Sequence, residues 1–345
     1  MTRICLQLRR HAVLLAGIAM MFGGLDASAQ SGTSPDPCVV RSARDTELVD
    51  RVHGELAEAV CSTSKWFDSF FGNPSDYDAY RATYGSISVG SLWDEYHGFD
   101  PRLRFKARMQ LPQLNGRLNA FVGRVDEDEF IAGSPEQFAA LPSQFRQVDD
   151  EKLLLGIGYS RPGLKGYIDA DVGIHLDIPL NPYTRVNYRR AWSLDDDTVF
   201  RFRQSAFWQE QEGLGTSTKL DFDHELNSTF LFRVTSIGMV AERTSGVEWS
   251  GLTTLFHGLD DKNALAYQVG VEGKTGSRVP VQDYGARIIY RRQFIREYLI
   301  LELRTGISWP RERVIDKREF TWGVGAAIEL RFGNWPHIAN DSRGS

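Results

Sequence analysis

Residues 102–111 read Arg-Leu-Arg-Phe-Lys-Ala-Arg-Met-Gln-Leu, and this stretch decides the fold. Apolar residues at the odd positions alternate with basic residues and one glutamine at the even positions. Successive side chains of a β-strand point to opposite faces, so this strand has one apolar face and one charged face. A soluble β-sandwich would bury the apolar face in a shared core. A transmembrane barrel turns that face toward lipid and keeps the charged face in a wet lumen.

The same alternation recurs along the last three quarters of the chain, in runs of roughly ten residues separated by turn residues. The predicted strands cover residues 85–93, 101–112, 117–126, 151–160, 165–177, 183–193, 197–209, 216–226, 228–238, 246–257, 262–272, 283–293, 297–309 and 319–333. A soluble sandwich would rarely contain so many uniform repeats. The first run has few large apolar residues, so twelve strands are the alternative to fourteen. We predict an all-β fold, an antiparallel transmembrane β-barrel of 12–14 strands, behind a short N-terminal helical segment.

The connections and the tryptophans support an even number of strands. Connections after even-numbered runs are short, whereas most of those after odd-numbered runs are longer, and the longest covers residues 127–150. Outer-membrane barrels have short periplasmic turns, longer outer loops and aromatic girdles at both interfaces. Five tryptophans fall near the predicted outer ends of their strands, namely Trp93, Trp208, Trp249, Trp309 and Trp322. Only Trp192 falls near an inner end.

The first 29 residues form a predicted export signal. Basic residues at positions 3, 9 and 10 precede an apolar stretch over residues 12–25, and Ala27-Ser28-Ala29 supplies a cleavage site. The mature chain is then expected to begin at Gln30, with a retained N-terminal anchor as the alternative. The apolar stretch is too short to span a membrane as a helix, and no later segment reaches ~18 apolar residues.

The charge of the mature chain limits its partners. Removing residues 1–29 leaves 37 basic and 44 acidic residues, a net charge near −7. This balance argues against nucleic acid as a partner, because no basic excess is present to neutralise phosphates. A quarter of the residues are charged, which a helical membrane protein could not accommodate. No cofactor is expected.

The segment over residues 30–82 has its own pattern. Apolar residues recur at helical spacing from Asp45, and four aromatic residues follow between positions 66 and 71. We expect a periplasmic helical hairpin, with a plug in the barrel mouth or an aromatic helix on the membrane surface as alternatives. Cys38 and Cys61 are expected to form a disulfide in the oxidising periplasm. Two free thiols are the alternative, and a metal site is disfavoured by their spacing.

Residues 84–333 resemble a bacterial, Gram-negative, single-chain outer-membrane β-barrel. Residues 320–332 resemble the C-terminal strand that such proteins present to the barrel assembly machinery, although thirteen residues follow Phe332. The resemblance implies a place in the bacterial outer membrane, with membrane lipids, lipopolysaccharide and the assembly machinery as partners. It transfers no functional residue. The predicted division is a signal peptide (1–29), a helical periplasmic or plug segment (30–82), the barrel (84–333) and a tail (334–345).

Lumen-lining residues are expected on the face opposite each apolar row. They are Arg102, Arg104, Lys106, Arg108, Asp169, Asp171, His175, Arg185, Arg189, Arg201, Arg203, Asp221, Asp223, Arg287, Glu302, Arg304, Glu329 and Arg331. Acidic and basic runs are neighbours, so one interpretation is a network of ion pairs that makes the wall rigid. The other is a polar pore whose charges set up a transverse field for small ionic solutes. The basic row at 102–108 is the best candidate for an uncompensated patch.

Two further groups of residues are candidates for a site. Asp223, His224 and Ser228 give the nearest approach to a hydrolytic site, but Asp223 should point away from His224, and Ser228 follows a turn. No catalytic residue and no metal ligand is therefore predicted, and His175 is expected to be structural. The acidic residues at 126–129 and 149–151 could share divalent cations with lipopolysaccharide, although a solvated loop is the simpler interpretation.

The expected function is a passive channel for small polar or ionic solutes, or a structural barrel, without covalent chemistry. The alternative is a lipid-active hydrolase of the phospholipase or lipid A deacylase type.

Overall fold

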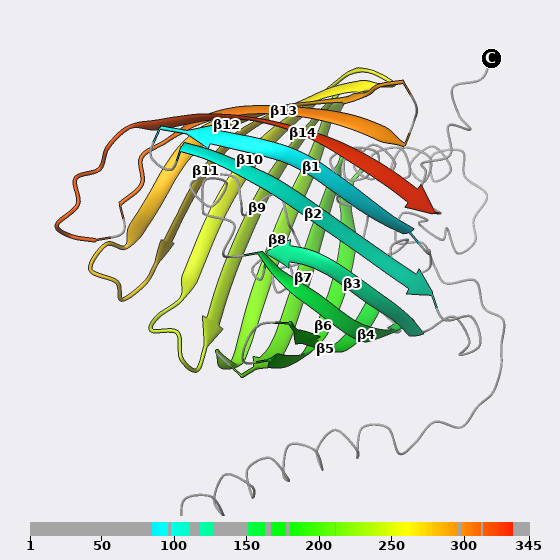
Figure 1. Ribbon diagram of the computed structural model, residues 1–345, viewed down its shortest axis with the longest axis vertical. Helices are drawn as coiled ribbons and strands as arrows, with labels where there is room; N and C mark the ends of the chain where they lie inside the picture. Colours follow the sequence, from blue (N-terminus) through cyan, green and yellow to red (C-terminus); the bar gives the residue numbers. More distant parts are fainter. Residues whose placement is uncertain are drawn as a thin grey trace, which may run out of the picture. The chain divides into compact units, whose positions relative to one another are not determined.

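The computed structural model describes residues 84–95, 98–110, 118–126, 151–162, 167–176, 180–210, 212–295, 298–311 and 313–333. These residues form one closed antiparallel β-barrel (Figure 1). The predicted signal peptide, helical segment, Cys38–Cys61 disulfide, acidic loop over residues 127–150 and tail all lie outside the described residues, as do Leu111 and Asp177. Among the residues described, no helix is long and apolar enough to cross a membrane.

Every predicted strand is present, and its ends differ from the prediction by at most three residues. The strands are β1 (Tyr84–Asp94), β2 (Gly98–Gln110), β3 (Leu118–Asp126), β4 (Glu151–Pro162), β5 (Tyr167–His175), β6 (Asn181–Asp195), β7 (Thr198–Gln209), β8 (Gly213–Asn227), β9 (Phe230–Ala241), β10 (Glu248–Asp260), β11 (Asn263–Lys274), β12 (Val281–Gln293), β13 (Leu299–Ser308) and β14 (Thr321–Gly333). Each strand pairs with its neighbours in sequence, and β1 pairs with β14 from Tyr84↔Gly333 to Asp94↔Gly323. The predicted antiparallel β-barrel is therefore confirmed, with fourteen strands rather than twelve.

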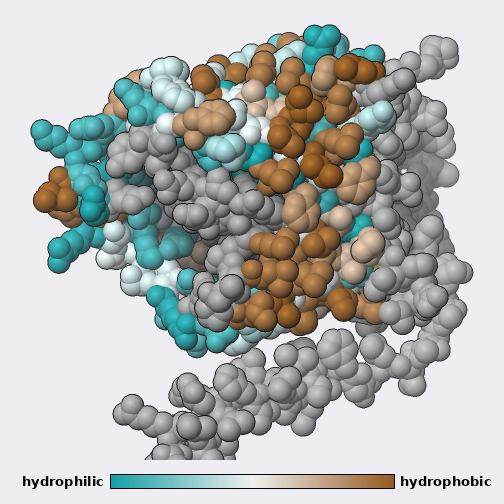
Figure 2. Space-filling view, in the orientation of Figure 1, coloured by the Kyte–Doolittle hydropathy of each residue, from teal (hydrophilic) through white to brown (hydrophobic). Residues whose placement is uncertain are grey.

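The outward face of the barrel is apolar. Val89, Leu103 and Ile157 are exposed by 59%, 49% and 55%, although they belong to well-paired strands. Figure 2 shows hydrophobic residues forming a band across the strands, with mainly hydrophilic residues toward one end. So large an apolar surface on a fully paired barrel is stable only against lipid. The alternation read from the sequence thus becomes two concentric faces, the inner one polar.

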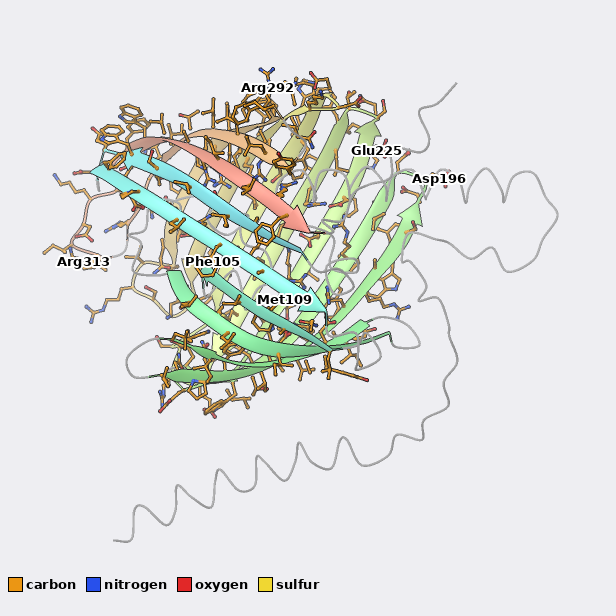
Figure 3. The ribbon with its side chains drawn as sticks, turned by 45° about the vertical axis from the view of Figure 1, so that its right-hand side comes forward. Phe105, Met109, Asp196, Glu225, Arg292 and Arg313 are labelled. Carbon is orange, nitrogen blue, oxygen red and sulfur yellow. The ribbon has the colours of Figure 1, made fainter. Side chains whose placement is uncertain are left out.

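The two ends of the barrel differ in their connections. At one end, here called the turn end, residues 196–197, 228–229 and 261–262 suffice to join strands. The last residues of the preceding strands cap these turns, because the carboxylate of Asp260 accepts from Lys262 N at 2.8 Å, and the Asn227 side chain accepts from Thr229 N at 2.9 Å. The opposite end, the loop end, carries most of the longer connections, including residues 309–320. In Figure 3, Asp196 and Glu225 lie at the turn end and Arg313 lies at the loop end.

Five tryptophans gather at the loop end, as predicted. Trp93 and Trp322, from neighbouring strands, have ring centroids 4.9 Å apart. Trp309 stacks on Tyr284 at 5.5 Å and contacts Phe320 at 5.7 Å. Trp208 and Trp249 each occupy the second position from the loop end of their strands. Because aromatic rings favour a membrane interface, this ring of residues marks where the apolar band meets water.

Candidate functional site

The candidate site is the inner wall of the barrel. All the predicted lumen-lining residues lie in the inward-facing rows, in strands whose burial alternates, as in β6. Their side chains are not independent of each other. Most belong to three clusters of ion pairs, which the closed sheet forms between neighbouring strands.

The first cluster joins β5 to β6. Arg185 and Asp171 are direct register partners, and the Arg185 Nη2 donates to Asp171 Oδ2 at 2.6 Å. Arg189 also pairs with Asp169, but diagonally, because its register partner is Tyr167. All four side chains are buried. Two positive and two negative charges therefore neutralise each other within this part of the wall.

The second cluster joins β7, β8 and β9. Asp223, which is fully buried, accepts from Arg233 Nε at 2.7 Å and Nη2 at 2.8 Å, and it also pairs with Arg201. Asp221 accepts from Thr235 Oγ1 at 2.6 Å and lies 3.4 Å from Lys219 Nζ. The Asp223 carboxylate of β8 thus binds guanidinium groups from both β7 and β9.

Arg233 was not predicted, and its strand explains why. Strand β9 places Leu231 and Ile237 on the inward face, both nearly inaccessible to solvent, while its outward face is also apolar. The strand therefore lacks the clear alternation that identified lumen residues elsewhere. Its one inward-facing arginine could be recognised only from the acidic row of β8 beside it.

The third cluster joins β12, β13 and β14. Arg291 pairs with both Glu302, at 3.3 Å, and Glu329, while Arg304 pairs with Glu302. The Arg331 Nε donates to Glu329 Oε1 at 3.1 Å. Three arginines therefore surround two glutamates. Nearby, the Arg287 Nε donates to the neutral Gln268 Oε1 at 2.9 Å, so that an amide holds a further cation.

The basic row of β2 is not entirely uncompensated, which corrects the prediction for Arg102. The Arg102 Nε donates to Asp100 Oδ2 at 2.8 Å, two residues earlier on the same strand. Asp100 precedes the predicted start of the strand, so the predicted basic row does not include this acid. Arg108, at the other end of the row, lies over the Phe121 ring at 5.5 Å.

The wall also has an apolar part that the sequence did not indicate. Near the turn end, the side chains of five inward-facing residues from β9 to β12 form a buried cluster. They are Leu231, Phe256, Ala264, Ala266 and Ile289. Apolar residues on both faces of a strand remove the period-2 signal, which is why inward-facing positions were missed here.

No hydrolytic site is assembled from Asp223, His224 and Ser228. Asp223 is bound to two arginines on the inner face, while His224 Nδ1 shares a 3.0 Å hydrogen bond with Thr198 Oγ1. Ser228 lies in the β8–β9 turn. His175 lies 3.4 Å from Asn181 Nδ2 and packs against Tyr183. Within the described part of the chain, no three His, Cys, Asp or Glu side chains are placed to hold a metal ion.

Comparisons with known proteins give only distant likenesses. No family model matches the chain. The chaperone for lacto-N-biosidase of Bifidobacterium longum is 27% identical over 146 residues, which are 41% of this chain, and the match spans half the length of that protein.

Among solved structures, the KdgM porin shares 8% identity over 72% of this chain and 99% of its own, with a TM-score of 0.35. OmpT, an outer membrane protein of Vibrio cholerae, shares 10% over 72% and 96%, with a TM-score of 0.44. The outer membrane channel DcaP of Acinetobacter baumannii shares 8% over 72% and 96%, with a TM-score of 0.43.

The architecture is that of a single-chain bacterial outer-membrane β-barrel, on the grounds of this chain's own closed sheet, apolar exterior and polar interior. Its function is inferred from its lumen.

Proposed function

We propose that this barrel lies in the bacterial outer membrane and passes small polar or ionic solutes passively through its lumen. The observation that carries the proposal is the polar, charged inner wall of a fourteen-stranded barrel. Barrels of about eight strands can be filled by their own side chains, and barrels of 16–18 strands leave an aqueous channel. We expect a barrel between these sizes to leave room inside its wall, because the ion-pair clusters fix many of the wall side chains to neighbouring strands.

The N-terminal segment, residues 30–82, is proposed to restrict the lumen from the periplasmic side. The first strand begins at Tyr84, at the turn end, so the preceding residues reach the barrel at that end. Their aromatic content exceeds what a linker needs. The turn end would then be periplasmic, since outer-membrane barrels have their short turns on that side.

Conductance in planar lipid bilayers tests the proposal. The full-length mature protein is expected to show discrete but small steps, and a variant lacking residues 30–82 is expected to show larger ones. Equal steps from both proteins would contradict the restricting role of the segment. Silence from both proteins would overturn the channel itself and leave a structural barrel or an enzyme.

A lipid hydrolase is the competing function. Its test is release of fatty acid from lipid A and phospholipid vesicles, with His224→Ala as the control. No release above background is expected, because His224 has Thr198 as its polar partner and Asp223 lies on the other face. Hydrolysis that is lost on His224→Ala substitution would favour the enzyme.

A further inference from the structure

The lumen charges that keep accessible surface away from the strand ends are basic, although other inward-facing basic residues are as buried as the acids, namely Arg185, Arg189, Lys219, Arg233, Arg287, Arg291 and Arg331. Six inward-facing acids are at most 9% exposed, namely Asp169, Asp171, Asp221, Asp223, Glu302 and Glu329. Several inward-facing basic side chains keep more of their surface accessible, including Arg102, Arg104, Lys106, Arg201, Arg203 and Arg304. The more exposed acids of the described wall, Asp100, Glu225, Glu248 and Glu272, lie within three residues of a strand end. A solute midway through the lumen therefore meets mainly positive charge.

The ion-pair clusters explain this difference. The β5–β6 cluster contains two carboxylates and two guanidinium groups. In β12–β14, Glu302 and Glu329 are surrounded by three arginines, and Asp223 of β8 alone holds two. A carboxylate that accepts from several guanidinium groups is covered by them, because each bond occupies one of its lone pairs. The acids are thus enclosed in the wall, and the basic groups there outnumber the carboxylates that they bind.

One sector of the wall concentrates the accessible basic groups. Arg304 of β13 is the register partner of Gly325 in β14, Gly325 is the partner of Leu92 in β1, and Leu92 is the partner of Asp100 in β2. Arg304 therefore lies at the level of the barrel wall where the basic row of β2 begins. Between β2 and β14 lies β1, whose inward-facing residues opposite Lys106, Arg104 and Arg102 are Ser86, Ser88 and Gly90. On the other side of β1, Arg331 and Glu329 of β14 are the register partners of Ser86 and Ser88, and Glu329 is bound by Arg291 and Arg331. Arg102, Arg104, Lys106 and Arg304 are called the basic track below.

Like charges held together in a cleft of low dielectric attract counter-ions strongly. Guanidinium groups suit carboxylates and phosphates in particular, since their paired N–H donors match two oxygens. We propose that the basic track makes the lumen anion-selective and binds carboxylate- or phosphate-bearing small solutes as they pass. The passage of such solutes rests on the proposed channel function, whereas binding to the track does not.

The first experiment measures the reversal potential of the full-length protein in planar bilayers under a KCl gradient. The wild type is expected to pass chloride in preference to potassium, and R102Q/R104Q/K106Q is expected to lose most of that preference. The matched control is R190Q/R292Q/K262Q, which removes the same charge outside the lumen. Arg190 lies over Trp192 at 4.6 Å on the outward face, Arg292 points away from the barrel (Figure 3), and Lys262 is exposed in a turn.

Wild-type selectivity for potassium, or an equal loss of chloride preference in both triple variants, would overturn the proposal. Unaltered heat-modifiable migration of each variant shows that it still folds. Asp100, which pairs with Arg102, lies near a strand end, where water can solvate the carboxylate that remains after the substitution.

The second experiment measures binding to the detergent-solubilised full-length protein by calorimetry, with citrate as the carboxylate probe and inorganic phosphate as the phosphate probe. Low ionic strength is used, because salt screens such attraction. Binding by the wild type and the control triple, but not by the basic-track triple, would support the site even if no protein conducts. If none of the three proteins binds either probe, or if all three bind equally, the proposed anion site is overturned whatever the conductance shows.

Discussion

Asp223 illustrates how single residues hold this wall together. Its side chain is fully buried, yet its two oxygens accept from arginines on both neighbouring strands. A buried ion pair is a weak source of net stability, because desolvation of the charges offsets their attraction. Removal of one partner is nevertheless costly, since the charge that remains is buried and uncompensated.

Asp223→Asn is therefore expected to destabilise the folded barrel by about 3–5 kcal/mol, the range for breaking a buried pair. The substitution keeps the shape of the side chain but leaves Arg201 and Arg233 facing a neutral amide. Urea titration of the protein in lipid vesicles measures the change. The control is Asp197→Asn in the exposed β6–β7 turn, which should be close to neutral. An effect at Asp223 no larger than at Asp197 would show that the cluster contributes little.

At the scale of elements, glycines determine how closely β4, β5 and β6 pack on the inner face. The Tyr183 hydroxyl of β6 lies over β5 and β4, where a Cβ added at Gly173 or Gly156 would come within 2.6 or 2.9 Å of it. Neither glycine has a positive φ, so glycine is required at these positions for lack of space and not for its backbone conformation. Tyr183 in turn packs with Phe121 and Leu154 in a small cluster that extends to β3.

Gly173→Ala is expected to lower stability by about 1–3 kcal/mol, the usual cost of overpacking. The added methyl group would meet Tyr183 Oη on one side and the backbone of Leu155 on the other, and the backbone cannot move aside. Gly251→Ala is the matched control, because its nearest neighbour would be 3.8 Å away. The two variants are compared by the temperature at which the folded band is lost in electrophoresis. Equal temperatures would contradict the packing described.

At the scale of the whole barrel, the pairing of β1 with β14 leaves no strand edge unpaired. This matters in lipid, where an unpaired backbone N–H or C=O costs several kcal/mol. Closure also explains why β1 is a strand despite its few large apolar residues: its backbone completes the ladders of both β2 and β14.

We accordingly expect the protein in detergent to migrate differently before and after boiling, and to give a β-type circular dichroism spectrum before boiling. A closed barrel resists local opening, because no strand can separate without breaking two ladders at once. Cell fractionation is the complementary measurement, and recovery of the protein in the soluble periplasmic extract would contradict the membrane assignment.

The strands, their number to within two, and the lipid-facing side of most of them could be predicted from the sequence. These properties are local, because a period of two and a turn residue can be read within ten residues of chain. The assignment of Leu103 to the lipid-facing side and of Arg104 to the lumen side requires no information about any other strand. The same reasoning failed for Leu231 and Arg233, whose strand is apolar on both faces.

Which lumen charges pair with each other depends on the tertiary structure. Asp223 binds Arg201 and Arg233, Arg102 turns to Asp100 of its own strand, and Arg291 joins Glu302 and Glu329. Register between strands and closure of β1 on β14 set these pairs, and neither is encoded within a single strand. The basic track arises for the same reason: its charges come from β2 and β13, which the chain separates by most of its length and the closed barrel brings together across β14 and β1.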